Sequence, residues 1–180
     1  MPRCTADDAT VHIYTYKAGL LSAVGHDLLL RVTDFTVDID PDDESIRGSF
    51  RADSIEVVYA LADGKPNDKA LSDDDRKTIL KYLNKDILKS ATYPTVDFAS
   101  SDVFAEDDEV EVEGDLTLCG TTRSITVTAA VEDDMARAEI VLNQPSFGIK
   151  PFTAMLGALK IQPDVRVVIA VPLATLAELG

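Results

Sequence analysis

Three residues that lie close together in the chain, Ser22, His26 and Asp27, have the side-chain types of a hydrolase triad. A triad works only when the hydroxyl, imidazole and carboxylate turn towards one another in space, and residues this near in sequence rarely converge in that way. The chain contains no GxSxG elbow, no GxGxxG fingerprint and no phosphate-cradling glycine loop. His26, which follows Gly25, therefore keeps two interpretations: a histidine that caps a turn, or a hydrogen-bond donor to the head group of a ligand.

Metal and thiol chemistry have little support in the sequence. The histidines, His12 and His26, form no HExxH pattern, and the cysteines, Cys4 and Cys119, show no CxxC spacing. Neither a metal site nor a cofactor is therefore expected. Cys119 lies at an expected hairpin and is interpreted as a small filler residue rather than a nucleophile. Two separate free thiols are typical of a reducing compartment.

The charge of the chain argues against one class of partner. The 180 residues include 17 Lys and Arg and 32 Asp and Glu, which gives a net charge of −15. Such a surface repels nucleic acid and anionic membranes. No apolar run approaches the roughly 20 residues of a membrane span, and the first residues lack the pattern of a signal peptide. We therefore expect a cytoplasmic protein that neither binds nucleic acid nor inserts stably into a membrane.

Most of the chain alternates between apolar and polar residues, which is the pattern of strands with one buried face. The clearest case is a pair of alternating runs joined by a short turn at 120–122, which predicts an antiparallel hairpin. The apolar residues of this pair are Val110, Val112, Leu116, Leu118, Ile125, Val127, Ala129 and Val131. The strands predicted in this way span 11–17, 28–40, 45–59 (with a bend near 53–54), 95–105, 109–120, 123–133, 136–147 and 164–173.

One long segment has helical instead of strand periodicity. From Asp73 onward, apolar residues recur at intervals of three and four. Ser72 is a credible N-cap, and the acidic first turn and the lysines near the end both match the helix dipole. The pattern predicts one amphipathic helix of about four turns that ends before Pro94. A shorter helical turn is predicted at 20–24.

The stretch SFGIKPFTAMLGALKIQPDV, residues 146–165, is apolar in an acidic chain and is interrupted by glycine and proline. Phe152, Met155, Leu156 and Leu159 have i, i+3, i+4, i+7 spacing, which suits a short helix or an irregular flap with one apolar face. Core packing alone explains that stripe. A lid or wall that bends across the end of a barrel and faces an apolar ligand also explains it, and this alternative predicts that the stretch lines or covers one end of a pore.

Long antiparallel strands in succession, each with one apolar face, must either stack as a sandwich or close on themselves. Closure removes exposed sheet edges, and an eight-stranded barrel has an interior wide enough for side chains or one slender ligand. The sequence therefore predicts an all-β protein, an eight-stranded antiparallel barrel with one amphipathic helix at its side.

Four stretches in order cover nearly the whole chain: GHDLLLRVTDF, LNKDILKSATYPTVDFASSDV, VEVEGDLTLCGTTRSITV and FGIKPFTAMLGALKIQPDVRVVIAV. Together they resemble the YceI-like family, and the pair YPTVDF and GDLTLCGTTR is the most specific part of the match. The resemblance implies a single lipocalin-like barrel domain over 1–180 with an elongated pore that holds an isoprenoid or similar amphiphilic chain. Much of the family is exported to the periplasm, whereas the FGIKPF…GALK ending resembles a cytoplasmic subgroup.

Three functions are compatible with such a barrel. The first is non-enzymatic binding, carriage or storage of an isoprenoid-type or other long-chain amphiphilic lipid in the pore. The second is an enzyme that uses the same apolar pocket with His26 as its acid or base, and the third is a filled barrel that acts through protein contacts. We favour the first and leave the oligomeric state, a homodimer included, open. The candidate ligand-binding residues are His26, Phe98, Leu116, Leu118, Ile125, Val127, Phe147, Phe152, Met155 and Leu156.

Overall fold

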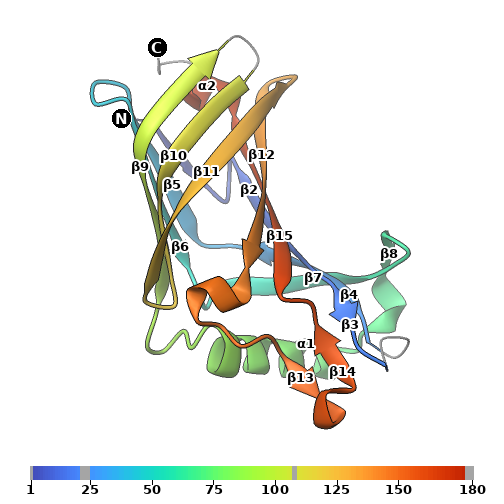
Figure 1. Cartoon of the computed structure of the whole chain (residues 1–180). Helices are drawn as coiled ribbons and strands as arrows, with labels where there is room; N and C mark the ends of the chain where they lie inside the picture. The colour runs from blue at the N-terminus through green and yellow to red at the C-terminus, as the bar shows by residue number, and fades with distance from the viewer. Residues whose placement is uncertain (1, 21–24, 107–108, 177–180) are drawn as a thin grey trace.

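The computed structural model describes residues 2–20, 25–106 and 109–176. A large curled antiparallel sheet forms the body, and helix α1 crosses one end of it (Figure 1). The predicted all-β class with one principal helix is confirmed; the short turn predicted at 20–24 falls largely outside the described residues. The strands of the large sheet, in pairing order, are β1 (Arg3–Thr5), β5 (Phe35–Asp40), β6 (Ser45–Arg51), β9 (Thr95–Glu106), β10 (Glu109–Leu118), β11 (Thr121–Glu132), β12 (Met135–Asn143), β15 (Asp164–Pro172), β2 (Thr10–Thr15), β4 (Asp27–Val32), β7 (Ile55–Ala62) and β8 (Lys65–Asn67).

A second, three-stranded sheet and several short helices complete the described part of the chain. This small sheet pairs β13 with β14 and β14 with β3. The remaining elements are β3 (Lys17–Ala18), η2 (Asp68–Ala70), α1 (Asp73–Tyr82), η3 (Leu83–Ile87), η4 (Gln144–Phe147), β13 (Thr153–Ala154), η5 (Met155–Gly157), β14 (Leu159–Ile161) and α2 (Leu173–Leu176).

Within the described ranges the large sheet contains 12 strands, so the predicted number of eight is wrong. Two predicted strands are each divided by a bend, β4 from β5 at 33–34 and β6 from β7 at 52–54. The bends lie side by side, because Thr33 donates its backbone N–H and its hydroxyl to the carbonyl oxygen of Ser54 at 3.1 and 2.7 Å. The short strands β1 and β8, which the sequence pattern misses, account for the rest of the difference.

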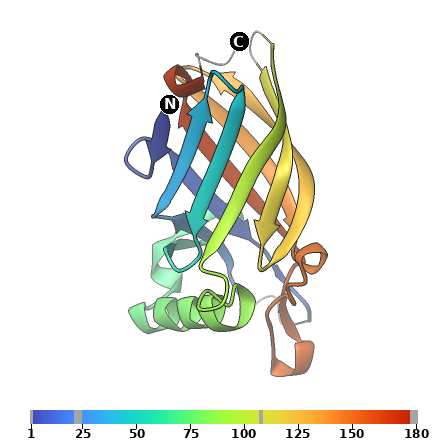
Figure 2. The same ribbon diagram turned by 90° about the vertical axis from the view of Figure 1, so that its left-hand side faces the viewer.

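The bent hairpin that runs from β4 to β7 curls the sheet. Its β5–β6 half pairs with β9, towards one end of the strand order, whereas its β4–β7 half pairs with β2, towards the other end. Only two or three residues separate the halves, so the chain itself ties the two ends of the sheet together. The result is the curled sheet that Figure 2 shows from the side.

The β10–β11 hairpin has the predicted alternation, with its turn displaced by one residue. Leu118 pairs with Thr121, so Cys119 and Gly120 alone form the loop. Both loop residues have positive φ values, 50° and 74°, as a two-residue type I′ turn requires. Cys119 is an unusual residue for the first position of such a turn, which explains why the sequence pattern places the turn too late.

Helix α1 begins as the sequence predicts. Ser72 and Asp75 form a capping box, in which the Asp75 N–H donates to the Ser72 hydroxyl at 3.1 Å and the Ser72 N–H donates to the Asp75 carboxylate at 2.9 Å. The helix continues into the π-helical turn η3 and ends well before Pro94. No helix in the described part of the chain combines the length and apolarity of a membrane-spanning helix.

Of the two forms predicted for the apolar stretch at 146–165, a short helix or an irregular flap, the regular helix is wrong. Thr153 pairs with Lys160 and Ala154 with Leu159, so β13 and β14 form a small hairpin around the single turn η5. Phe152 and Leu159, on the two sides of this hairpin, both line the cavity, whereas the residues between them at the tip do not. The two residues at the tip, Met155 and Leu156, are 63% and 109% exposed.

Candidate ligand-binding cavity

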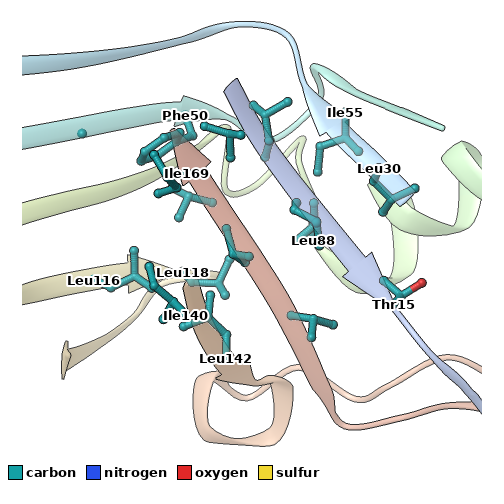
Figure 3. A pocket seen from close by; sticks show the side chains of 18 of the residues that line it. Thr15, Leu30, Phe50, Ile55, Leu88, Leu116, Leu118, Ile140, Leu142 and Ile169 are labelled. Carbon is teal, nitrogen blue, oxygen red and sulfur yellow. The ribbon is translucent and has the colours of Figure 1, made fainter. Parts of the chain in front are cut away.

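A cavity of about 520 Å³ lies inside the curled sheet. This volume is within the range of small-molecule binding sites. Figure 3 shows how its lining side chains converge from opposite walls, with those of β10 and β12 on one side and those of β2 and β4 on the other, and with Leu88 between them. The side chains labelled in the view are Thr15, Leu30, Phe50, Ile55, Leu88, Leu116, Leu118, Ile140, Leu142 and Ile169.

The lining is apolar because the strands alternate. Every second residue of β10 is exposed, and the residues between them, such as Val110 and Val112, are buried. The same alternation on β11 directs Ile125 and Val127 inward. Since the inner face of each strand carries almost only Val, Ile, Leu, Phe and Ala, the curled sheet encloses a hydrophobic space.

One wall of the cavity is not packed against other side chains. Val127, Ile140 and Val165 lie on the neighbouring strands β11, β12 and β15 and line the cavity. All three are only half-buried, and neither packed cluster of the described residues includes them. Inward-facing residues that keep this exposure lie beside a hollow, whereas a filled barrel would bury them.

The few polar groups of the lining gather at the end of the cavity nearest α1. Thr15 ends β2, Thr78 and Tyr82 belong to α1, and Gln144 follows β12. The Thr15 hydroxyl oxygen is buried and has no hydrogen-bond partner, so it is free to contact a polar atom of a ligand. Near the opposite end, the buried residues around α2 are apolar, and the cavity therefore has one polar and one apolar end.

Charge is nearly absent from this lining. Arg51 is the one lysine or arginine that lines the cavity within the described ranges. Its guanidinium donates to both carboxylate oxygens of Asp53 at 2.9 Å, so it is already paired. The described lining therefore offers no unpaired lysine or arginine to a phosphate group.

The cavity reaches the surface beside α1. Thr78 and Tyr82 line it and are at the same time exposed to solvent. Tyr82 contacts Phe152, which precedes β13, edge to face, with ring centroids 5.2 Å apart. Both rings line the cavity, so this aromatic pair spans its mouth between α1 and the small sheet.

Replacing Phe152 by alanine should speed the release of a long-chain ligand. The aromatic contact is worth about 0.5–1.5 kcal/mol, so we expect dissociation to become roughly three- to tenfold faster. Stopped-flow displacement of a bound fluorescent fatty-chain probe measures this rate. Phe104→Ala is the control, because Phe104 is 54% exposed and lies outside the lining; equal rates in the two variants would show that the pair does not restrict the mouth.

The structure brings together seven of the ten candidate residues around the cavity. Phe147, Met155 and Leu156 lie outside the lining: Phe147 is buried against Leu116 and Ile149, and the other two are exposed at the tip of the small hairpin. Ligand contact by any of the ten stays a prediction. The seven that line the cavity are His26, Phe98, Leu116, Leu118, Ile125, Val127 and Phe152.

Sequence reasoning missed much of the lining on β12, β15 and β2. The run at 165–171 alternates clearly and could have supplied Val165 and Val167. Ile140 was harder to find, because the preceding inward positions of β12, Ala136 and Ala138, are small and weaken the alternation.

The geometry offers little for acid–base chemistry at His26. His26 lines the cavity, and it exerts a minor attraction on Asp75, whose pKa is lowered mainly by the hydrogen bond from the Ser72 hydroxyl and next by the Ser72 backbone N–H. That carboxylate is exposed and already accepts the hydrogen bonds of the helix cap, so it is poorly placed to orient His26 as a base. Burial raises the pKa of the Cys119 thiol, which keeps it protonated and a weak nucleophile.

Fold and cavity together define a class: lipocalin-like proteins in which a curled antiparallel sheet encloses an apolar hollow. A family model for the YceI-like domain matches residues 9–173, and the chain belongs to the YceI-like family. The resemblance of the four sequence stretches is thereby confirmed.

Solved structures agree with this fold. BcnA of Burkholderia cenocepacia is similar with a TM-score of 0.60 and 16% identity, over 90% of this chain and 94% of that chain. A polyisoprenoid binding domain from Saccharophagus degradans implicated in plant cell wall breakdown is similar with a TM-score of 0.59 and 11% identity, over 91% of this chain and 94% of that chain. The YCEI protein of Campylobacter jejuni is similar with a TM-score of 0.56 and 16% identity, over 79% of this chain and 81% of that chain. Identities this low support a shared fold and nothing more. A search of curated protein sequences gives no match.

Proposed function

We propose that this protein binds an isoprenoid-type or other long-chain amphiphilic lipid in the cavity and carries or stores it without changing it chemically. The observation that carries the proposal is the cavity of about 520 Å³ with its apolar lining. The Saccharophagus degradans neighbour, described as a polyisoprenoid binding domain, supports the same ligand class.

The distribution of polar groups favours one orientation of the ligand. The apolar tail extends towards α2, and the polar end lies near α1, within reach of the unpaired hydroxyl of Thr15. Because Arg51 is paired with Asp53, an uncharged head group fits the lining better than a phosphate. His26, which also lines this region, is a hydrogen-bonding group in this proposal and not a catalyst.

The energetics need no special chemistry. Each CH₂-sized group of the tail contributes about 0.8 kcal/mol when it leaves water, so about a dozen such groups contribute roughly 10 kcal/mol. Association costs about 4–15 kcal/mol. A tail of about 20 such groups, which contributes roughly 16 kcal/mol, therefore exceeds this cost without any charged contact.

A titration with a fluorescent isoprenoid analogue tests the proposal. We expect saturable binding of one molecule per chain, competed by an unlabelled polyprenol and not by a short alcohol that lacks the tail. Fluorescence that rises without saturation, or that the polyprenol fails to displace, would contradict specific binding in the cavity.

We also propose that the protein works in a reducing, cytoplasmic environment. Cys4 and Cys119 are both free thiols, as is usual for proteins of such compartments.

A further inference from the structure

Three large apolar side chains stand exposed at the end of the molecule where the cavity opens. Leu20 is 94% exposed, Met155 is 63% exposed and Leu156 is 109% exposed. We call these three residues the apolar tip. Exposed apolar residues scattered singly are ordinary, whereas a group of them marks an interaction site.

The backbone holds the tip outward. Met155 and Leu156 have φ values of 51° and 56°, in the left-handed region that residues other than glycine rarely adopt. Leu20 is brought to the same place by its neighbour Gly19, where a Cβ atom would lie 2.4 Å from the carbonyl oxygen of Ala158. The two chain segments therefore touch at a point where only glycine fits, and strain of this kind is concentrated at functional sites.

The charge around the tip differs from that of the rest of the protein. Of the 180 residues 32 are acidic, yet the segments 16–26 and 144–163 contain none. Their charged residues are Lys17, Lys150 and Lys160. Pairing of β3 with β14 joins the two segments, with Lys160 opposite Ala18 and Lys17 opposite Ile161. Lys160 and Lys17 therefore project from opposite faces of the small sheet, so a basic residue lies on each side of this sheet in an otherwise acidic chain.

The tip also adjoins the mouth of the cavity. Phe152 and Leu159, on either side of it in the chain, both line the cavity. In Figures 1 and 2 the η5 loop projects beyond α1, which carries the acidic turn 73–75. Any surface that contacts the tip therefore lies next to the mouth of the cavity.

We propose that the apolar tip docks onto an anionic lipid bilayer, with its three side chains among the head groups and with Lys17 and Lys160, on the two faces of the small sheet, against lipid phosphates. Basic and apolar residues combined in this way are typical of peripheral membrane attachment. Salt reduces the repulsion from the distant acidic surface, because charges farther apart than about 8 Å are screened at physiological ionic strength. Docking presents the cavity mouth to the membrane from which a lipid is taken. The docking itself rests on the proposed function only for the identity of the lipid that is carried.

Co-sedimentation with vesicles at physiological ionic strength tests the docking. The vesicles contain phosphatidylglycerol and phosphatidylcholine in equal parts, or phosphatidylcholine alone. We expect the wild-type chain to bind the mixed vesicles more tightly, and the double variant Met155→Glu, Leu156→Glu to bind them at least tenfold more weakly. Lys160→Glu should remove the preference for phosphatidylglycerol. Val141→Glu is the matched control, because Val141 is 62% exposed on the barrel wall, and its binding should equal that of the wild type.

Failure of docking and failure of the cavity function give different results. In a vesicle-free titration with the fluorescent isoprenoid analogue, the double variant should bind as the wild type does, because the two residues lie outside the lining. Loss of vesicle binding in the double variant but not in Val141→Glu supports the proposal. Wild-type protein that stays in the supernatant, or a double variant that sediments as the wild type does, overturns it whatever the titration shows.

Discussion

Replacing Val127 by phenylalanine is expected to weaken binding of a long-chain ligand at least tenfold, about 1.4 kcal/mol, while the thermal midpoint stays the same or rises. Val127 lines the cavity, is half-buried and belongs to neither packed cluster of the described residues. A larger ring there fills space that the ligand tail would occupy, and it displaces no protein side chain. The titration with the isoprenoid analogue and a thermal melt on the same preparation measure both effects.

The matched control is Val57→Phe. Val57 is 8% exposed, belongs to the larger packed cluster and does not line the cavity. Extra carbons in a packed core cost about 1–3 kcal/mol, so this variant should melt earlier. If Val127→Phe destabilises the protein as much as Val57→Phe does, the interior is filled and the barrel does not hold a ligand.

A carboxylate inside the cavity should have a still larger effect on binding. Ile140→Glu places a charge in the unpacked wall of β12, where a bound apolar tail would strip it of water. Burying such a group costs several kcal/mol without a partner, and we expect binding to fall about a hundredfold, or about 2.8 kcal/mol. The fold should survive, because water reaches the empty cavity through its mouth.

The adjacent residue supplies the control for this charge. Val141 follows Ile140 on the same strand and faces outward, 62% exposed. Val141→Glu should bind the analogue as the wild type does. Equal losses in Ile140→Glu and Val141→Glu would show that the added negative charge acts at long range and not through the cavity.

The elements that the sequence predicted best are those whose local signals agree with their packing. Strict alternation defines β10 and β11, and Ser72 with Asp75 defines the start of α1. The bend at Thr33 was missed although the sequence carries a signal for it: the inward apolar positions are Leu28, Leu30 and Val32 before it and Phe35, Val37 and Ile39 after it, so the alternation shifts by one residue there. That bend depends on a hydrogen bond from Thr33 to Ser54, a contact between distant residues that no local pattern records.

The sequence predicted an apolar cavity but identified only part of its lining. The alternation of apolar and polar residues on β10 and β11 identified the inward-facing residues Leu118, Ile125 and Val127, which line the cavity. Helical spacing wrongly placed Met155 and Leu156 on one face with Phe152. The cause is a pair of left-handed residues at a hairpin tip, and such a conformation has no sequence signal when neither residue is glycine or asparagine.

Native mass spectrometry of the intact protein, purified without detergent and then incubated with a polyprenol, is the sharpest test of whether the cavity holds a lipid. We expect a single additional species, heavier than the chain by the mass of one lipid, which organic extraction removes and which is absent from Val127→Phe treated in the same way. A spectrum that shows only the bare chain after incubation would contradict the proposal that the cavity holds a long-chain amphiphile. An adduct equally abundant in both proteins would place the lipid outside the cavity.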